Sequence, residues 1–166
     1  IATCILLLNA GHEATVHTLG NGVKALIESG HGADALAPER VEGTVEEILR
    51  FDPALHLFTR WAYEEVEIAG HGFRRGDEVA CLLAAANRDP AQWDRPARFN
   101  PGRPVKPNLT FGAGLHFCVG APLARLELRT ALPILFARLP GLSLAEPPRY
   151  ANLFHFHGLD GLVVRR

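Results

Sequence analysis

Prolines between residues 90 and 107 limit the possible folds of this chain more than any other feature. Five of them remove backbone donors so often that residues 88–109 can form neither a regular helix nor a strand. They are Pro90, Pro96, Pro101, Pro104 and Pro107. We therefore predict an irregular but packed segment, which follows a region of helix and strand patterns and precedes one further helix.

Three stretches carry apolar residues at the spacing of an α-helix. The first covers residues 1–29 and is ended by Gly30-His31-Gly32. The second covers residues 39–51, and Asp52-Pro53 closes it. The third runs from about residue 121 to residue 139. These are long elements for a chain of 166 residues, so the protein is predicted to be mainly helical.

Short strands are predicted in two further regions. Val66 and Ile68 alternate with acidic residues, a turn is expected at residues 70–72, and residues 78–83 are a second strand candidate. The tail, residues 142–164, has the pattern of short strands and turns. The fold class is therefore α+β, mainly α with small β-sheets.

The opening run, residues 1–8, is strongly apolar but too short to cross a bilayer, which needs roughly 20 residues. It also lacks the positive start of a signal peptide. We expect it to lie in a buried core helix. The chain contains no methionine and no capping residue before the run, so we expect that it begins inside a longer helix.

Charge and cysteine content exclude several classes of protein. Seventeen Lys and Arg residues stand against eighteen Asp and Glu residues, which gives no indication of nucleic-acid binding. Cys4, Cys81 and Cys118 are widely separated, so neither a disulfide framework nor a structural zinc site is predicted, and the cytoplasm is favoured. The histidines outside the Cys118 segment, His155 and His157 included, show no pattern of metal ligands.

The most informative stretch is Phe111-Gly112-Ala113-Gly114-Leu115-His116-Phe117-Cys118-Val119-Gly120. It places Cys118 just before a predicted helix, where the helix dipole and free N–H groups favour a thiolate. The glycines allow tight turns and a close approach to a flat ligand. A single thiolate without other soft ligands suits a porphyrin iron, which brings four nitrogens of its own. The alternative is a buried structural cysteine.

This pattern, Phe-Gly-x-Gly-x-His-x-Cys-x-Gly, resembles the haem-binding loop of the cytochrome P-450 family, and Ala124 continues it as a small residue beside the haem. The resemblance covers nearly the whole chain and is closest to soluble bacterial members. It implies the C-terminal part of that fold, starting within the long central helix. Residues 1–166 would be a partial domain without its N-terminal part, and residues 111–120 would be the haem-thiolate loop.

A second family mark is Glu-x-x-Arg, present as Glu47 and Arg50 on one helical face. The resemblance implies a buried structural network, which Arg98 is expected to complete. By itself such a pair is more often a solvated surface contact.

The resemblance also assigns contacts to the haem and to a redox partner. Arg60, just before the first strand candidate, and His116 match residues that bind the haem propionates. Phe111, Gly112 and Gly120 belong to the loop itself. Arg125 lies toward the face where family members receive electrons from a ferredoxin or a flavoprotein reductase. A surface arginine or a solvated histidine is the alternative for each basic residue.

Ala10-Gly11-His12-Glu13-Ala14-Thr15 resembles the oxygen-binding stretch of the central helix. Gly11 is unfavourable in a helix by about 1 kcal/mol relative to Ala, which room for haem and dioxygen, with local opening of the helix, would explain. Glu13 could relay protons. The threonine that usually follows the acid is replaced by Ala14. Thr15 could contribute in its place, although it is rotated roughly 100° around the helix.

Together these assignments imply a haem-dependent monooxygenase that inserts one atom of O2 into a C–H or double bond of a small organic substrate. Its cofactor would be haem b, iron protoporphyrin IX, with Cys118 as axial ligand. Electrons would come from NAD(P)H through a redox partner. Two alternatives remain: a truncated, non-catalytic fragment with weak or no haem binding, and a plain α+β binding module with a structural cysteine.

Overall fold

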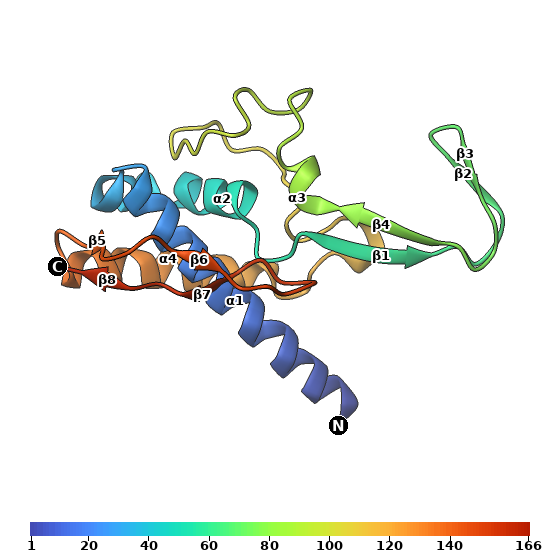
Figure 1. The fold of residues 1–166 in the computed structure, drawn as a ribbon, viewed down its shortest axis with the longest axis horizontal. Coiled ribbons are helices and arrows are strands. Elements are labelled where there is room, and N and C mark those ends of the chain that lie inside the picture. Colours follow the sequence, from blue (N-terminus) through green and yellow to red (C-terminus); the bar gives the residue numbers. More distant parts are fainter.

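A computed structural model describes residues 1–166, and it is built from helices and four two-stranded sheets (Figure 1). The helices are α1 (Ala2–Glu28), α2 (Val41–Phe51), α3 (Leu83–Ala86) and α4 (Ala121–Arg138), with 3-10 turns at Gly32–Leu36 and Gly114–His116. The strands are β1 (Leu57–Trp61), β2 (Val66–Ile68), β3 (His71–Phe73), β4 (Glu78–Leu82), β5 (Ser143–Leu144), β6 (Arg149–Tyr150), β7 (Leu159–Gly161) and β8 (Val164–Arg165). The predicted α+β class is confirmed.

The hydrophobic core lies where α1, α2 and α4 meet. Leu26 of α1, Ile48 of α2 and Leu132 of α4 are almost completely buried. Burial of such side chains stabilises the fold by about 1.5–3 kcal/mol each. α1 ends where the sequence predicted, because Gly30 adopts a φ of 71° that the helix cannot continue.

The two halves of α1 differ sharply. Its second half is buried, but Ile5, Leu6, Leu7 and Leu8 are all more than half exposed. The prediction of a buried core helix was therefore wrong for the opening run, because no other segment of this chain reaches it. In Figure 1 the first turns of α1 project away from the remaining elements.

Two glycines permit close approaches to α1. A Cβ on Gly22 would lie 3.1 Å from Cγ2 of Ile48, so α1 and α2 pack closely at this point. A Cβ on Gly158 would overlap the ring of His17, only 1.8 Å from its Nδ1. The C-terminal segment can therefore cross α1 only with a bare backbone at residue 158.

The strands of the central region form two separate antiparallel pairs. β4 pairs antiparallel with β1, which places Arg60 opposite Val79, while β2 and β3 form their own hairpin. The hairpin lies at the far end of the arm that β1 and β4 make (Figure 1). In the tail, β5 pairs with β8 and β6 pairs with β7.

The proline-containing segment is irregular and packed, as predicted. Asn87 at its start donates to the Thr110 hydroxyl at its end over 2.9 Å, and the Thr110 hydroxyl donates to the Leu49 carbonyl of α2 over 2.6 Å. Trp93 and Phe99 within the segment are buried. The segment is therefore fixed on α2 immediately before the Cys118 loop.

No helix of the structure combines the length and the apolarity needed to cross a membrane.

Candidate functional site

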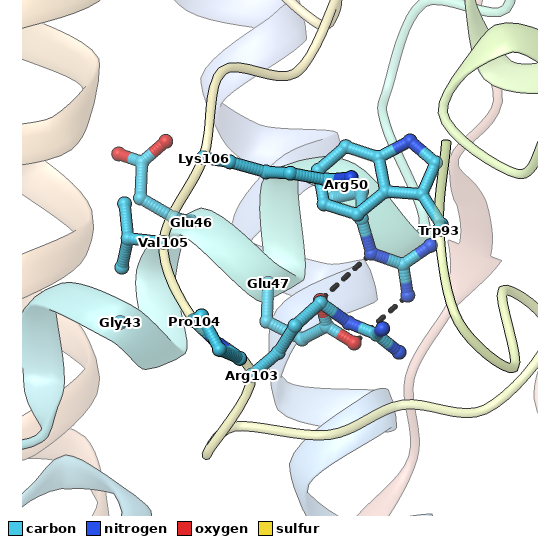
Figure 2. A pocket seen from close by; sticks show the side chains of 9 residues that line it. All are labelled: Gly43, Glu46, Glu47, Arg50, Trp93, Arg103, Pro104, Val105 and Lys106. Atoms are coloured by element: carbon cyan, nitrogen blue, oxygen red, sulfur yellow. Dashed lines mark hydrogen bonds and ion pairs between the residues drawn. The ribbon is translucent and has the colours of Figure 1, made fainter. Parts of the chain in front are cut away.

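A buried ion network lies beneath the proline-containing segment. Glu47 and Arg50 are 3% and 1% exposed, and Arg50 donates to both carboxylate oxygens, at 2.7 and 2.8 Å. Glu47 also accepts from the Asn100 backbone N–H at 2.8 Å and from Nε of Arg103 at 3.1 Å. Figure 2 shows Glu47 between the two arginines. Such complete pairing is what a buried carboxylate requires.

The prediction that Arg98 completes this network was wrong. Arg103 provides the second guanidinium, and Arg98 contributes only its backbone carbonyl, which accepts from both Arg50 and Arg103. The remaining N–H groups of Arg50 reach the carbonyls of Asn87 and Pro96. The small hollow in Figure 2 is lined by these charged groups, so it belongs to the scaffold and has no room for a substrate.

The Cys118 loop turns tightly just before α4. Gly112 and Gly114 both have a φ of 71°, a conformation that favours glycine. The Cys118 N–H donates to the Phe111 carbonyl over 3.0 Å, which closes the loop, and the Ala121 N–H donates to the Cys118 carbonyl over 3.3 Å. A Cβ on Gly120 would lie 3.8 Å from the Cys118 sulfur. The sulfur therefore lies at the first turn of α4.

The surroundings of Cys118 are apolar and open. Cys118 is a free, partly exposed thiol, unlike the fully buried cysteine that a structural role predicts. Leu115, Phe117 and Val119 beside it are 95%, 50% and 84% exposed. Three large apolar side chains exposed within five residues of the chain are typical of a surface that binds another group.

Arg125 lies one turn into α4, next to this loop. Its Nε donates to Glu46 of α2 at 2.5 Å, and its guanidinium carbon lies 4.7 Å from the centre of the Phe111 ring. The hydrogen bond to Glu46 and, to a smaller extent, the charge of Cys118 raise the pKa of Arg125 above its usual value. Arg125 is therefore paired within the chain, and its predicted contact with a redox partner stays a prediction.

Arg60 and His116, the predicted propionate contacts, are both exposed. The Arg60 guanidinium donates only to the adjacent Thr59 carbonyl and forms no ion pair, and His116 ends the 3-10 turn two residues before Cys118. Their side chains are free to meet an anionic group. Ala124, also predicted to lie beside the haem, is half-buried on α4, and its N–H donates to Gly120.

The predicted oxygen-binding stretch lies in the exposed half of α1. Ala10, Gly11 and Glu13 are exposed, and a Cβ on Gly11 would have no neighbour within 4 Å. The Thr15 hydroxyl donates to the Gly11 carbonyl over 2.9 Å. α1 continues through Gly11 without interruption, so the local opening that was expected is not present in this structure.

A second cluster was missed at the sequence level. Nε2 of His157 lies 3.1 Å from Oδ1 of Asp52, and the imidazoles of His56 and His157 stack with ring centres 3.9 Å apart. The histidines outside the Cys118 segment were expected to show no metal-ligand pattern, but ligand atoms of His56, His157 and Asp52 all lie within 4.8 Å of one another. The pairing of Leu55 with Phe156 and the bond from the His157 backbone N–H to the Ala54 carbonyl bring these segments together, and no local motif signals either contact.

Comparison with known proteins agrees with this geometry. The Cytochrome P450 family model matches residues 1–139. The chain belongs to the cytochrome P450 family. Its predicted place, the C-terminal part of that fold, agrees with matches that cover nearly all of this chain and less than half of each related protein.

Two curated relatives illustrate the match. The chain is 41% identical to the biotin biosynthesis cytochrome P450 of Bacillus subtilis, over 98% of this chain and 42% of that protein. It is also 41% identical to 6-deoxyerythronolide B hydroxylase of Saccharopolyspora erythraea, over 97% of this chain and 41% of that protein. The chain thus spans about two fifths of the length of these relatives.

Solved structures give the same result. The crystal structure of P450BioI in complex with a hexadec-9Z-enoic acid ligated acyl carrier protein matches with a TM-score of 0.92 and 40% identity, over 97% of this chain and 43% of that chain. CYP109B1 of Bacillus subtilis matches with a TM-score of 0.93 and 37% identity, over 99% and 45%.

Family membership implies a haem cofactor, and the residues of this chain fit one. The loop offers one cysteine sulfur, and Cys118 belongs to no cluster of metal-binding side chains that could hold a bare ion. A porphyrin supplies the missing four nitrogens. The exposed apolar side chains beside Cys118 suit a flat macrocycle, and the unpaired cation of Arg60 suits its carboxylates.

Proposed function

We propose that this chain forms the haem-thiolate half of a monooxygenase that inserts one atom of O2 into a small organic substrate, by hydroxylation of a C–H bond or by epoxidation. The observation that carries the proposal is Cys118, partly exposed at the head of α4 in a loop shaped by glycines. When bound, haem b supplies the activation of dioxygen, and a thiolate ligand assists cleavage of the O–O bond.

Cys118 would be held as a thiolate by its position. Cys118 stands just before the first turn of α4, and the N-terminal end of a helix dipole favours negative charge there. Arg125 lies one turn further along α4, where it pairs with Glu46. Hydrogen bonds at the sulfur are the usual way in which a protein tunes such a ligand.

Arg60 and His116 would bind the two propionates of the haem. Neither side chain has a carboxylate partner within the chain, so pairing with a propionate would not break an existing contact. Phe111, Gly112 and Gly120 would line the macrocycle from the loop, and Ala124 from α4. Ala10 and Gly11 would face its other side from α1, where the missing side chain of Gly11 leaves space.

Glu13 would carry protons toward the reacting oxygen. Its Oε1 lies 3.7 Å from Nε2 of His17 one helical turn later, so a second titratable group stands beside it. Thr15 would have a weaker role than a threonine at position 14, because its hydroxyl already donates to the Gly11 carbonyl.

Electrons would reach the site from NAD(P)H through a ferredoxin or flavoprotein reductase, with Arg125 near the docking face. We place the protein in the cytoplasm because all three cysteines are free.

A truncated, non-catalytic fragment is the second candidate, because the chain spans only about two fifths of its curated relatives. The exposed first half of α1 favours it for the isolated chain, since nothing covers that side of the site. It predicts weak haem binding by the 166 residues alone and full binding when the N-terminal part is restored.

The reduced carbon-monoxide difference spectrum tests the proposal, measured on the chain and on a version extended at its N-terminus. We expect the long-wavelength Soret band for which the family is named, at least in the extended protein. Cys118→Ala should abolish it, and Cys81→Ala, which changes an exposed cysteine on β4, should leave it unchanged. Absence of the band from the extended protein, or its survival in Cys118→Ala, would overturn the assignment.

A further inference from the structure

A compact group of polar side chains includes neither Cys118 nor any other residue of its loop. Asp52 ends α2, His56 precedes β1, and His157 belongs to the C-terminal segment. The proposed monooxygenase function uses none of them. We propose that Asp52, His56 and His157 form a binding site for one divalent transition-metal ion of the zinc class.

The donor set selects the kind of ion. One carboxylate and two imidazoles are the ligands preferred by Zn²⁺, Co²⁺ and Ni²⁺, whereas Ca²⁺ and Mg²⁺ prefer oxygen alone. Nε2 of His157 and Oδ1 of Asp52 are 3.1 Å apart. A tetrahedron with metal–ligand distances of about 2 Å has edges of roughly 3.3 Å, so these two atoms already have nearly the required spacing.

Two of the three ligands are held rigidly. The backbone N–H of His157 donates to the backbone carbonyl of Ala54 over 2.7 Å. Nδ2 of Asn21, which is fully buried on α1, donates to the backbone carbonyls of both Asp52 and His157, at 3.1 and 2.8 Å. Ligands fixed in this way lose little freedom when a metal binds.

The Asn21 side chain that joins two of the proposed ligands also carries an unpaired polar atom. Oδ1 of the same Asn21 side chain is buried and has no hydrogen-bond partner. Native proteins rarely leave such an acceptor unpaired, so a water or an ion with its water belongs near it. It is the only buried side-chain nitrogen or oxygen of the chain in this condition, and its amide joins two of the proposed ligands.

His56 is the adjustable ligand. Its side chain makes no hydrogen bond and is half-buried, and its ring stacks on His157 at an interplanar angle of 26°. Stacked rings do not aim their nitrogens at one point, so the His56 ring turns when metal binds.

Nearby charges set an upper limit on the affinity. Lys24 and Arg88 both act on this cluster and oppose a dication. Each is partly occupied, because Lys24 pairs with Glu28 at 2.8 Å and Arg88 donates to the Phe51 carbonyl. On the other side, the Tyr150 hydroxyl donates to Oδ2 of Asp52 over 2.5 Å and holds the carboxylate in place. Removal of the Lys24 charge should therefore strengthen binding.

Titration of the haem-free chain of 166 residues with Co²⁺ and then Zn²⁺ tests the site, with ligand-field absorption and calorimetry as readouts. We expect one equivalent of metal in the wild type and in Cys118→Ser, because the site does not use the thiolate. His56→Gln should weaken binding at least about tenfold, while Lys24→Gln tightens it.

His155→Gln is the matched control, because His155 is exposed, lies two residues from His157 and belongs to no metal-binding cluster. Far-UV circular dichroism checks the fold of each variant, and His56→Gln is preferred to a His157 variant because His56 makes no side-chain hydrogen bond. Absence of metal uptake, equal affinity in His56→Gln, or loss of the site in Cys118→Ser would each overturn the proposal.

Discussion

The Glu47 network and the Cys118 loop lie in succession along the chain and are built in opposite ways. Around Glu47 every charge is buried and paired, with four donors converging on one carboxylate. Around Cys118 the apolar side chains are exposed, and Arg60 has no ionic partner. A network satisfied within the chain serves the scaffold, whereas an open site with unpaired groups is prepared for a ligand.

The comparison predicts that changes in the network affect stability and that changes in the open site affect haem binding. Glu47→Gln should have the largest effect, a loss of about 3–5 kcal/mol in the free energy of unfolding, because it leaves two arginines buried without a full counter-charge. Urea unfolding measures it. Glu42→Gln is the control, since Glu42 is 75% exposed in its pair with Arg129. A change below about 1 kcal/mol for Glu47→Gln would break the comparison.

Asp52, a buried carboxylate at the end of α2, should make the stability of the fold depend on pH. Burial alone would raise its pKa, but hydrogen bonds from His157 and Tyr150 outweigh burial and hold the pKa below the usual 3.8. The unfolded chain therefore binds this proton more readily. The stabilisation is present above pH 3.8 and is lost as the pH falls through the lower pKa of the folded state.

Urea unfolding between neutral and acidic pH measures this contribution in the metal-free protein. Asp52→Asn should remove part of the acid dependence of the wild type. If both proteins lose stability in parallel over that range, the folded carboxylate does not have the lowered pKa described here.

Gly11 on α1 offers the converse test, a change that should affect haem binding without loss of stability. Gly11→Ala should stabilise α1 by about 1 kcal/mol, because alanine favours the helix and nothing lies within 4 Å of the new Cβ. The same change should weaken haem uptake in the N-terminally extended protein if the haem lies against Gly11. Gly20→Ala is the matched control, since its Cβ would meet only Leu159, at 3.8 Å. Equal haem uptake by both variants would show that the haem does not lie against Gly11.

Arg125 contacts both Glu46, the neighbour of Glu47, and Phe111 of the Cys118 loop. Its substitution should cause the smallest change in stability. Its pair with Glu46 is partly exposed, so Arg125→Gln should lower the free energy of unfolding by about 0.5 kcal/mol. Thermal unfolding beside the wild type measures it. A loss above about 2 kcal/mol would assign Arg125 to the scaffold instead.

The sequence predicted what depends on local pattern. Helical periodicity located α1, α2 and α4 within a few residues, and the prolines located the irregular segment. It failed where distant residues meet. The family resemblance pointed to Arg98, but Arg103 fills the position, because an irregular backbone has no period that tells which side chain turns inward. The contact of His56 with His157 depends on a pairing between remote segments, which no local signal encodes.

The central claim, that Cys118 binds the haem iron, is tested most directly by X-ray absorption at the iron edge of the haem-loaded, N-terminally extended protein. We predict one sulfur atom bonded to iron together with the nitrogens of the porphyrin. It should disappear in Cys118→Ser and remain in Cys81→Ser. An iron surrounded only by nitrogen and oxygen in the unaltered protein, or a sulfur ligand that persists in Cys118→Ser, would contradict the account.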